Sequence, residues 1–471
     1  MPNTHQARER LRVFQEFFMI EQPISPPLGS SPLRSLLSRV RNSKLFRNIV
    51  TAVSGTAGAQ LINLALMPVI MRIYGPESFG VLGTFQSVSM ILITVAALTY
   101  PTAIVLPRRE ADAHKLIRLS LKVAACIALS LTVVLVLFGK QIAETLNIEI
   151  LIPFLLLLPF TMFTGAVLEI CQQWLYRTHQ FRLTATAATT HALLYNGMRS
   201  GAGLIAASPP VLVVTTALYY AVHSGILIVG ILLTRKKRVP VPEPEGIEEE
   251  PVQSVAKRYR DFPIFRAPQV LINAIAVNMP TLVLASMYGA VPAGFFALCA
   301  QVLSMPNNLI GKAVGDVYYP RITQAIHEKE PLVPLLLKGI AGLTAIGFVP
   351  FVLLSIIGPW LFGLVFGAQW YEAGEYARWL ALAELAGFMA RPCMVAIPAL
   401  ELQGRYLIVE IASTVLRIGG AVLGGLIFKD PLGVVTTYAA VNGAINLTVI
   451  GLVLVQARKW DRRTAARAAR A

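Results

Sequence analysis

Charged residues are scarce in this sequence: they make up 14% of its 471 residues, whereas 55% are hydrophobic. Soluble globular domains carry about 25% charged residues, and one water-soluble core of this length does not need so many apolar side chains. A soluble globular protein is therefore excluded, and we expect the chain to fold in a membrane.

Cysteine is rare as well. Cys126, Cys171, Cys299 and Cys393 all fall in apolar segments, and their spacing is not that of metal ligands. A Gly-Lys-Ser/Thr loop, which would cradle phosphates, is missing too. We therefore expect no disulfide, no metal site, no bound cofactor and no ATP hydrolysis by this chain.

Basic residues outnumber acidic ones and give a formal net charge of +16. They gather in the tails and in alternate connections between apolar segments, which is typical of proteins that contact anionic lipid headgroups. We therefore expect anionic membrane lipids as partners and no nucleic acid.

Long apolar runs are abundant. A bilayer core needs roughly 20 apolar residues per helix. Runs of about this length occur at 48–72, 79–106, 115–138, 150–172, 183–206, 211–234, 263–289, 291–316, 335–357, 376–398, 406–428 and 432–457. The sequence therefore predicts an all-α integral membrane protein of about twelve transmembrane helices.

Lysine and arginine occur mainly in every second connection, whereas the intervening connections hold little beyond Lys140 and Lys429. Basic loops stay on the cytoplasmic side of a membrane. We therefore expect an even number of spans in the cell (inner) membrane, with both termini in the cytoplasm.

The middle connection is rich in proline and glutamate, which is typical of a solvated linker between two halves. It divides the chain into two predicted six-helix bundles. The expected parts are a basic N-tail with an amphipathic helix (1–47), a first bundle (48–234), a cytoplasmic linker (235–262), a second bundle (263–457) and a basic C-tail (458–471).

The two halves share a short pattern. Tyr74-Gly75 is followed by Gly80, and Tyr288-Gly289 is followed by Gly294 at the same spacing. Many transporters built from duplicated halves have their substrate site at the interface between them. A chance match is the alternative, because glycine is favoured in any tight turn.

Four stretches carry a family resemblance. Arg72 to Gly80 reads RIYGPESFG and Ile104 to Pro107 reads IVLP; Tyr259 to Pro263 reads YRDFP and Tyr318 to Arg321 reads YYPR. Together they resemble the polysaccharide-biosynthesis flippases, the Wzx-type O-antigen translocases. The resemblance extends over roughly residues 45 to 457.

The resemblance implies two bundles around a central cavity that opens alternately to either side of the membrane. It also implies a substrate, an undecaprenyl-diphosphate-linked oligosaccharide used for O-antigen, capsule or exopolysaccharide. Other membrane proteins of polysaccharide assembly are candidate partners.

Two alternatives stay open. One is a multidrug or lipid II carrier of the same superfamily, the multidrug/oligosaccharidyl-lipid/polysaccharide exporters. The other is a membrane glycan polymerase or ligase, which the short outer connections disfavour. We therefore expect a carrier and not an enzyme.

Cations inside the predicted spans are the candidate substrate-binding residues, because a lone charge at a helix centre costs about 2.5 to 3.5 kcal/mol and needs a reason to be there. They are Arg199, Arg266, Lys312, Arg391 and Arg417. A guanidinium in a cavity would bind a diphosphate or an acidic sugar. Arg266 and Lys312 lie nearer helix ends, from which they could instead reach the membrane surface.

Glu384 and Arg391, and likewise Glu410 and Arg417, are seven residues apart and so share a helix face. Either these faces line one cavity or they form ion pairs between helices. The two acids are also candidates for proton or sodium coupling. The polar side chains of Gln60, Asn63, His191 and His223 are further candidates for the cavity lining, with bonds between helices as the alternative.

If Arg391 and Arg417 hold the substrate, Arg391→Ala and Arg417→Ala will each abolish glycan export because the anionic headgroup loses its counter-charge. Membrane insertion should be unchanged. Export is measured as surface polysaccharide, and insertion by quantifying the protein in membranes. Full export by both variants would show that these arginines are only structural.

Overall fold

The computed structural model describes residues 44–235 and 251–468, without the side chains of 44–57, 235, 308–313, 316, 317, 403, 405, 467 and 468. The described residues from Thr51 onward belong to one compact unit, and the architecture below is that of this unit. The expected amphipathic helix of the N-tail lies outside the described residues.

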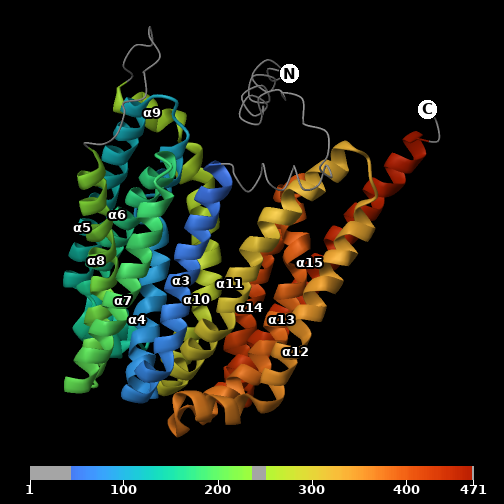
Figure 1. The fold of residues 1–471 in the computed structure, drawn as a ribbon. Coiled ribbons are helices and arrows are strands. Elements are labelled where there is room, and N and C mark those ends of the chain that lie inside the picture. The colour runs from blue at the N-terminus through green and yellow to red at the C-terminus, as the bar shows by residue number, and fades with distance from the viewer. Residues whose placement is uncertain (1–43, 236–250, 469–471) are drawn as a thin grey trace, which may run out of the picture. The chain divides into compact units, whose positions relative to one another are not determined.

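The described chain is helical and contains no strand. The long helices of the first half are α3 (Lys44–Ile73), α4 (Pro76–Val95), α5 (Glu110–Thr145), α6 (Leu157–Arg177), α7 (Phe181–Ile205) and α8 (Pro209–Arg235). Those of the second half are α10 (Ala267–Tyr288), α11 (Ala290–His327), α12 (Leu332–Phe366), α13 (Tyr371–Ala399), α14 (Gln403–Phe428) and α15 (Pro431–Ala468), as labelled in Figure 1. Each predicted apolar range overlaps one of these helices.

Nine helices of the described residues are long and apolar enough to cross a membrane, and α3 adds a shorter apolar stretch, Gly58–Ile73. This confirms a multi-pass, all-α membrane protein. The number of spans, twelve, stays a prediction.

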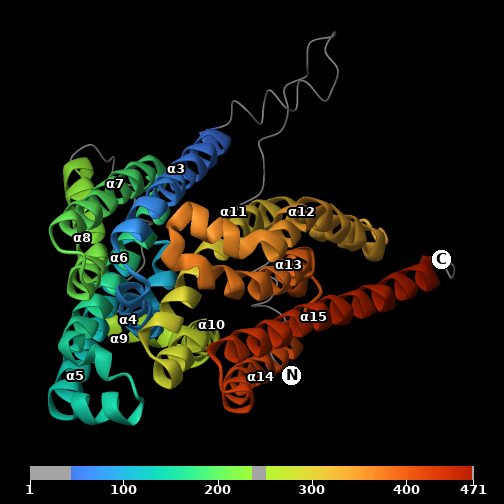
Figure 2. The same cartoon turned by 90° about the horizontal axis from the view of Figure 1, so that it is seen from below.

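Most helices pack within their own halves, but α4 of the first half also packs on α10 and α11 of the second. In the first half α4 contacts α6 and α8, while α5 packs on α6 and α7 on α8. In the second half α13 is central and packs on α11, α12 and α15. Figure 2 shows the two groups side by side, with α4, α10 and α11 between them.

Part of the connection between the halves lies within the described residues. The described part, from residue 251, contains the short helix α9 (Val252–Arg258) and one π-helical turn, η3 (Phe262–Arg266). Val255 of α9 is fully buried in an apolar cluster with Ala113 and Leu116 of α5. The prolines and glutamates of this connection predicted a linker. The burial of Val255 attaches the last part of the linker to the first bundle.

The two bundles meet where α4 and α11 begin. A Cβ on Gly80 would lie 1.8 Å from the carbonyl oxygen of Ala290, and one on Gly294 would lie 2.2 Å from that of Pro76. Only glycine permits such a close approach of two helices. Both glycines belong to the pattern shared by the two halves, so this pattern marks their contact.

Hydrogen bonds close the same end, which we call the inter-bundle joint. Arg72 Nη2 donates to the Leu364 carbonyl at 2.8 Å, Trp370 Nε1 donates to the Met71 carbonyl at 2.8 Å, and Gln369 Nε2 donates to the same carbonyl at 3.0 Å. The basic connections of the chain lie at the other end of these helices.

Gly294→Ala should destabilise the protein by about 1 to 3 kcal/mol, because the added methyl group overpacks the helix contact. The midpoint of thermal unfolding in detergent measures this. Gly201→Ala in α7 is the matched control, since nothing lies within 4 Å of its added Cβ. Equal midpoints for both variants would contradict the close contact.

Candidate functional site

A polar cavity of about 320 Å³ lies mainly in the first bundle, between α3, α4, α6, α7 and α8, with one residue from α11. Its polar lining consists of amides, hydroxyls, one imidazole and one guanidinium. These residues are Asn63, Gln86, Gln172, Tyr195, Asn196, Arg199, Thr216, Tyr219, Tyr220, His223 and Gln301. Among the described residues the lining contains no carboxylate.

Arg199 is the charged residue of this lining. Its side chain is 7% exposed, and Nε and Nη2 are buried without a hydrogen-bond partner among the described residues. The guanidinium instead stacks over the rings of Tyr195 and Phe79, with its carbon 5.1 and 5.6 Å from their centroids. Cation–π contacts offset part of the cost of burial but leave N–H donors unused.

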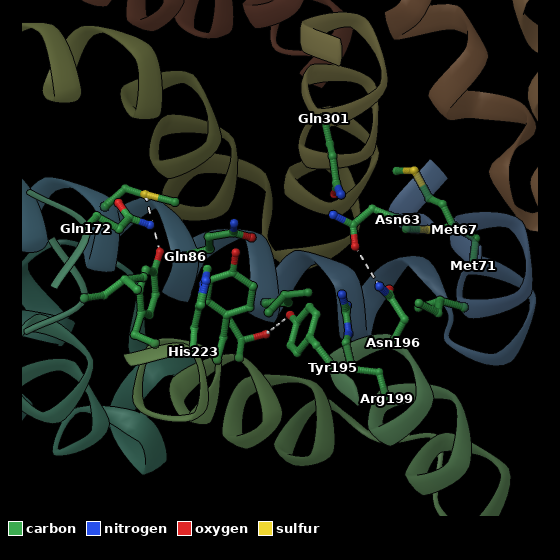
Figure 3. A pocket seen from close by; sticks show the side chains of 17 residues that line it. Asn63, Met67, Met71, Gln86, Gln172, Tyr195, Asn196, Arg199, His223 and Gln301 are labelled. Carbon is green, nitrogen blue, oxygen red and sulfur yellow. Dashed lines mark hydrogen bonds between the residues drawn. The ribbon is translucent and has the colours of Figure 1, made fainter. Parts of the chain in front are cut away.

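Amide side chains continue the lining on both sides. Asn196 Nδ2 donates to Asn63 Oδ1 at 2.6 Å and to the Ala192 carbonyl at 2.7 Å. Gln301 reaches from α11 toward Asn63 (Figure 3). The second bundle therefore contributes to the same polar surface, and amides both donate and accept hydrogen bonds, as sugar hydroxyls require.

An aromatic wall closes the cavity along α7 and α8. Tyr195 and Tyr219 meet edge to face with centroids 4.9 Å apart, and the Tyr195 hydroxyl bonds to Thr216 at 3.0 Å. Behind them the rings of His191 and His223 stack at 4.5 Å and 9°. His191, Tyr195 and Arg199 are four residues apart along α7 and so share one face.

The four charged residues predicted on α13 and α14 form a separate group. The Asn307 amide donates to the Glu384 carboxylate, and Asn273 Nδ2 donates to Glu410 Oε1 at 3.2 Å. Arg391 and Arg417 act electrostatically on Glu384. Neither arginine forms an ion pair within 4.0 Å among the described residues. None of the four lines the polar cavity.

The remaining predicted residues are dispersed. Arg266 is exposed at the end of η3, with Glu169 as an electrostatic partner, and Gln60 is also exposed outside the lining. Asn63 lines the cavity, whereas His191 lies behind it. The side chain of Lys312 is outside the described residues.

Beyond Asn63 and His223, the sequence analysis did not identify the uncharged part of the lining. Gln86, Gln172 and Gln301 each interrupt an apolar helix, which is a usable signal because an amide facing lipid is costly. Tyr195 and Tyr219 carry no such signal, since tyrosine is common in packed helices. Because the candidates were chosen mainly by charge, the prediction favoured Arg391 on α13 and Arg417 on α14.

Two helical bundles joined at one end, with a polar cavity between helices in a membrane-spanning fold, define a membrane carrier. Residues 69–375 match the family described as polysaccharide biosynthesis protein. This match covers more than half of the chain, which therefore belongs to that family and confirms the resemblance in its sequence.

Comparisons with individual proteins agree with this family. The chain is 23% identical over 431 residues to the succinoglycan biosynthesis transport protein ExoT of Rhizobium meliloti (strain 1021), over 87% of this chain and 77% of that protein. It has the fold of a multidrug resistance MATE family transporter of the MOP superfamily in its inward-facing conformation, with a TM-score of 0.66 at 14% identity over 88% and 99% of the two chains.

A MOP superfamily transporter from Pyrococcus furiosus, which has a binding pocket of reverse polarity, has a TM-score of 0.59 at 13% identity, over 89% of this chain and 96% of that one. These likenesses show the fold. The protein is thus a multi-pass transporter of the polysaccharide biosynthesis family with a MOP superfamily fold.

Asn307→Leu should destabilise the protein by about 1 to 3 kcal/mol, because it removes the hydrogen bond to a half-buried carboxylate. Adding Glu384→Gln should recover part of this loss, because a neutral amide has a lower desolvation cost. The two single variants and the double variant, compared by thermal unfolding, form a double-mutant cycle. Simple addition of the two effects would contradict the contact.

Proposed function

We propose that this protein is a flippase that moves an undecaprenyl-diphosphate-linked oligosaccharide across the cytoplasmic membrane during synthesis of O-antigen, capsule or exopolysaccharide. Its family and the name of its relative ExoT support a polysaccharide cargo. The observation that carries the proposal is the buried guanidinium of Arg199, which has unused donors in a polar cavity.

A diphosphate fits this site chemically. Guanidinium groups bind phosphate oxygens through paired, charge-assisted hydrogen bonds, which are stronger where water is excluded. The amides of Asn63, Gln86 and Gln301 suit the hydroxyls of neutral sugars. The prenyl tail is apolar, so it stays in the bilayer while the headgroup crosses.

The basic end of the helices is proposed to face the cytoplasm, as the positive-inside rule requires. The inter-bundle joint then closes the external side, and the cavity loads from the cytoplasm. Its volume of about 320 Å³ is at the small end of ligand pockets. A longer glycan therefore requires the bundles to separate during alternating access.

Export of a small amphiphilic molecule is the second candidate. The observation that favours it is the same volume together with the aromatic wall, because cavities of roughly 300 to 1,000 Å³ with aromatic linings are typical of small-ligand sites. Neither candidate involves covalent chemistry, and the protein is proposed to act as a carrier and not as an enzyme.

Arg199→Gln should lower flipping at least about tenfold, because a charge-assisted hydrogen bond contributes about 1.5 to 3 kcal/mol. The measurement is the fraction of lipid-linked glycan on each membrane face in a strain that lacks the wild-type gene. Arg199→Lys should retain part of the activity, since it keeps the charge.

Arg266→Gln is the matched control, because Arg266 is exposed and outside the cavity. It should flip glycan at the wild-type rate. Wild-type distribution of glycolipid in the Arg199→Gln strain would refute the proposed role. Unchanged glycan in the deletion strain, with raised drug sensitivity, would favour the small-molecule candidate.

A further inference from the structure

The stacked histidines of the aromatic wall are not used by the function proposed above. His191 and His223 are 2% and 7% exposed. Their rings are nearly parallel, with centroids 4.5 Å apart, and Tyr219 meets the His191 ring edge to face at 4.4 Å. Two titratable rings are thus held at fixed geometry beside a cavity.

The ring nitrogens of this pair are largely unsatisfied. The His191 ring hydrogen-bonds to the backbone of Tyr219, but its Nε2 is buried without a partner. His223 lines the cavity, and both of its ring nitrogens lack a hydrogen-bond partner among the described residues. Buried polar atoms are usually satisfied in proteins, so three such nitrogens together indicate a site that acquires a partner.

The surroundings determine which partner is favoured. Titratable and charged groups facing the pair are Tyr195 and Arg199 of α7 and Tyr219 and Tyr220 of α8. The other helices around the cavity contribute amides and no charge: Asn63 of α3, Gln86 of α4, Gln172 of α6 and Gln301 of α11.

Glu169 of α6 does not balance the pair, because it is outside the cavity lining and its electrostatic partner is Arg266 of η3. Protonating either histidine in the empty cavity would therefore place a second positive charge near Arg199. An anion in the cavity would supply the missing negative charge.

We propose that the His191–His223 pair binds one proton together with the anionic headgroup held at Arg199. The proton comes from cavity water and binds to a free ring nitrogen, which then becomes a donor toward the cavity. This inference rests on the proposed function, because it needs an anion at Arg199. It assigns to the headgroup site a second, proton-dependent cationic group.

Thermodynamic linkage determines whether the anion binds more tightly at low or at high pH. If the anion favours the protonated pair, the protonated pair favours the anion by the same factor. Anion affinity is then greatest at low pH. It is lost as the pH rises through the pKa of the histidine pair in the anion-bound protein. One coupled proton permits a change of at most about tenfold per pH unit.

The test uses the full-length protein in nanodiscs of zwitterionic lipid, with inorganic sulfate as the probe, because its charge is constant between pH 6 and pH 8. Titration calorimetry gives the affinity at each pH. Repeating it in buffers of different ionisation enthalpy gives the number of protons taken up. We expect affinity to rise about tenfold from pH 8 to pH 6, which corresponds to about half a proton bound per sulfate on average over this range, with the uptake greatest at pH 6.

Histidine variants distinguish proton uptake by the His191–His223 pair from anion binding at Arg199. His191→Phe and His223→Gln should each keep sulfate binding at pH 8 and lose most of the proton uptake. His114→Gln is the matched control, because His114 is exposed on α5, and it should behave as wild type. Size-exclusion profiles and unfolding midpoints establish that each variant is folded.

The outcomes are distinct. Sulfate binding that requires Arg199 but takes up no proton overturns this inference and leaves the proposed anion site standing. Sulfate binding that is absent from the wild type, or unchanged by Arg199→Gln, removes the anion site and this inference with it. Proton uptake that persists in both histidine variants shows that another group titrates, and also overturns the inference.

Discussion

The buried guanidinium of Arg199, which has no carboxylate partner in the described part of the chain, is the constraint on which the rest of this structure depends. Such a charge is costly at membrane depth unless polar or aromatic groups surround it. The first bundle provides these groups: the rings of Phe79 and Tyr195, and a cavity lined by amides. The arrangement of α3, α4, α7 and α8 is therefore also the arrangement that surrounds Arg199 and leaves its N–H donors available.

The charged residues of α13 and α14 in the second bundle have different surroundings. Glu384 and Glu410 each accept a hydrogen bond from an asparagine, and the arginines near them act on Glu384. These groups offset one another, whereas the first bundle leaves a net positive site. The two halves of the chain thus share a helical plan and the glycines at their contact, but among the described residues it is the first half that presents an unbalanced charge to the cavity.

The fold was largely predictable because the bilayer imposes a length on every apolar helix and basic residues mark alternate connections. The site was only partly predictable. Arg199 was identified by its charge, but charge alone gave Arg391 and Arg417 equal weight, since counter-charges and asparagines on neighbouring helices do not appear in one helix's sequence. The stacking of His191 on His223 depends on how α7 meets α8, which no periodicity within either helix specifies.

Phe79, at the start of α4, contacts both the Arg199 site and the inter-bundle joint. One face of its ring lies under the Arg199 guanidinium, while Trp370 of the other bundle meets it edge to face at 5.5 Å and 85°. A shift of this one ring would therefore change both the surroundings of the Arg199 guanidinium and the packing at the inter-bundle joint.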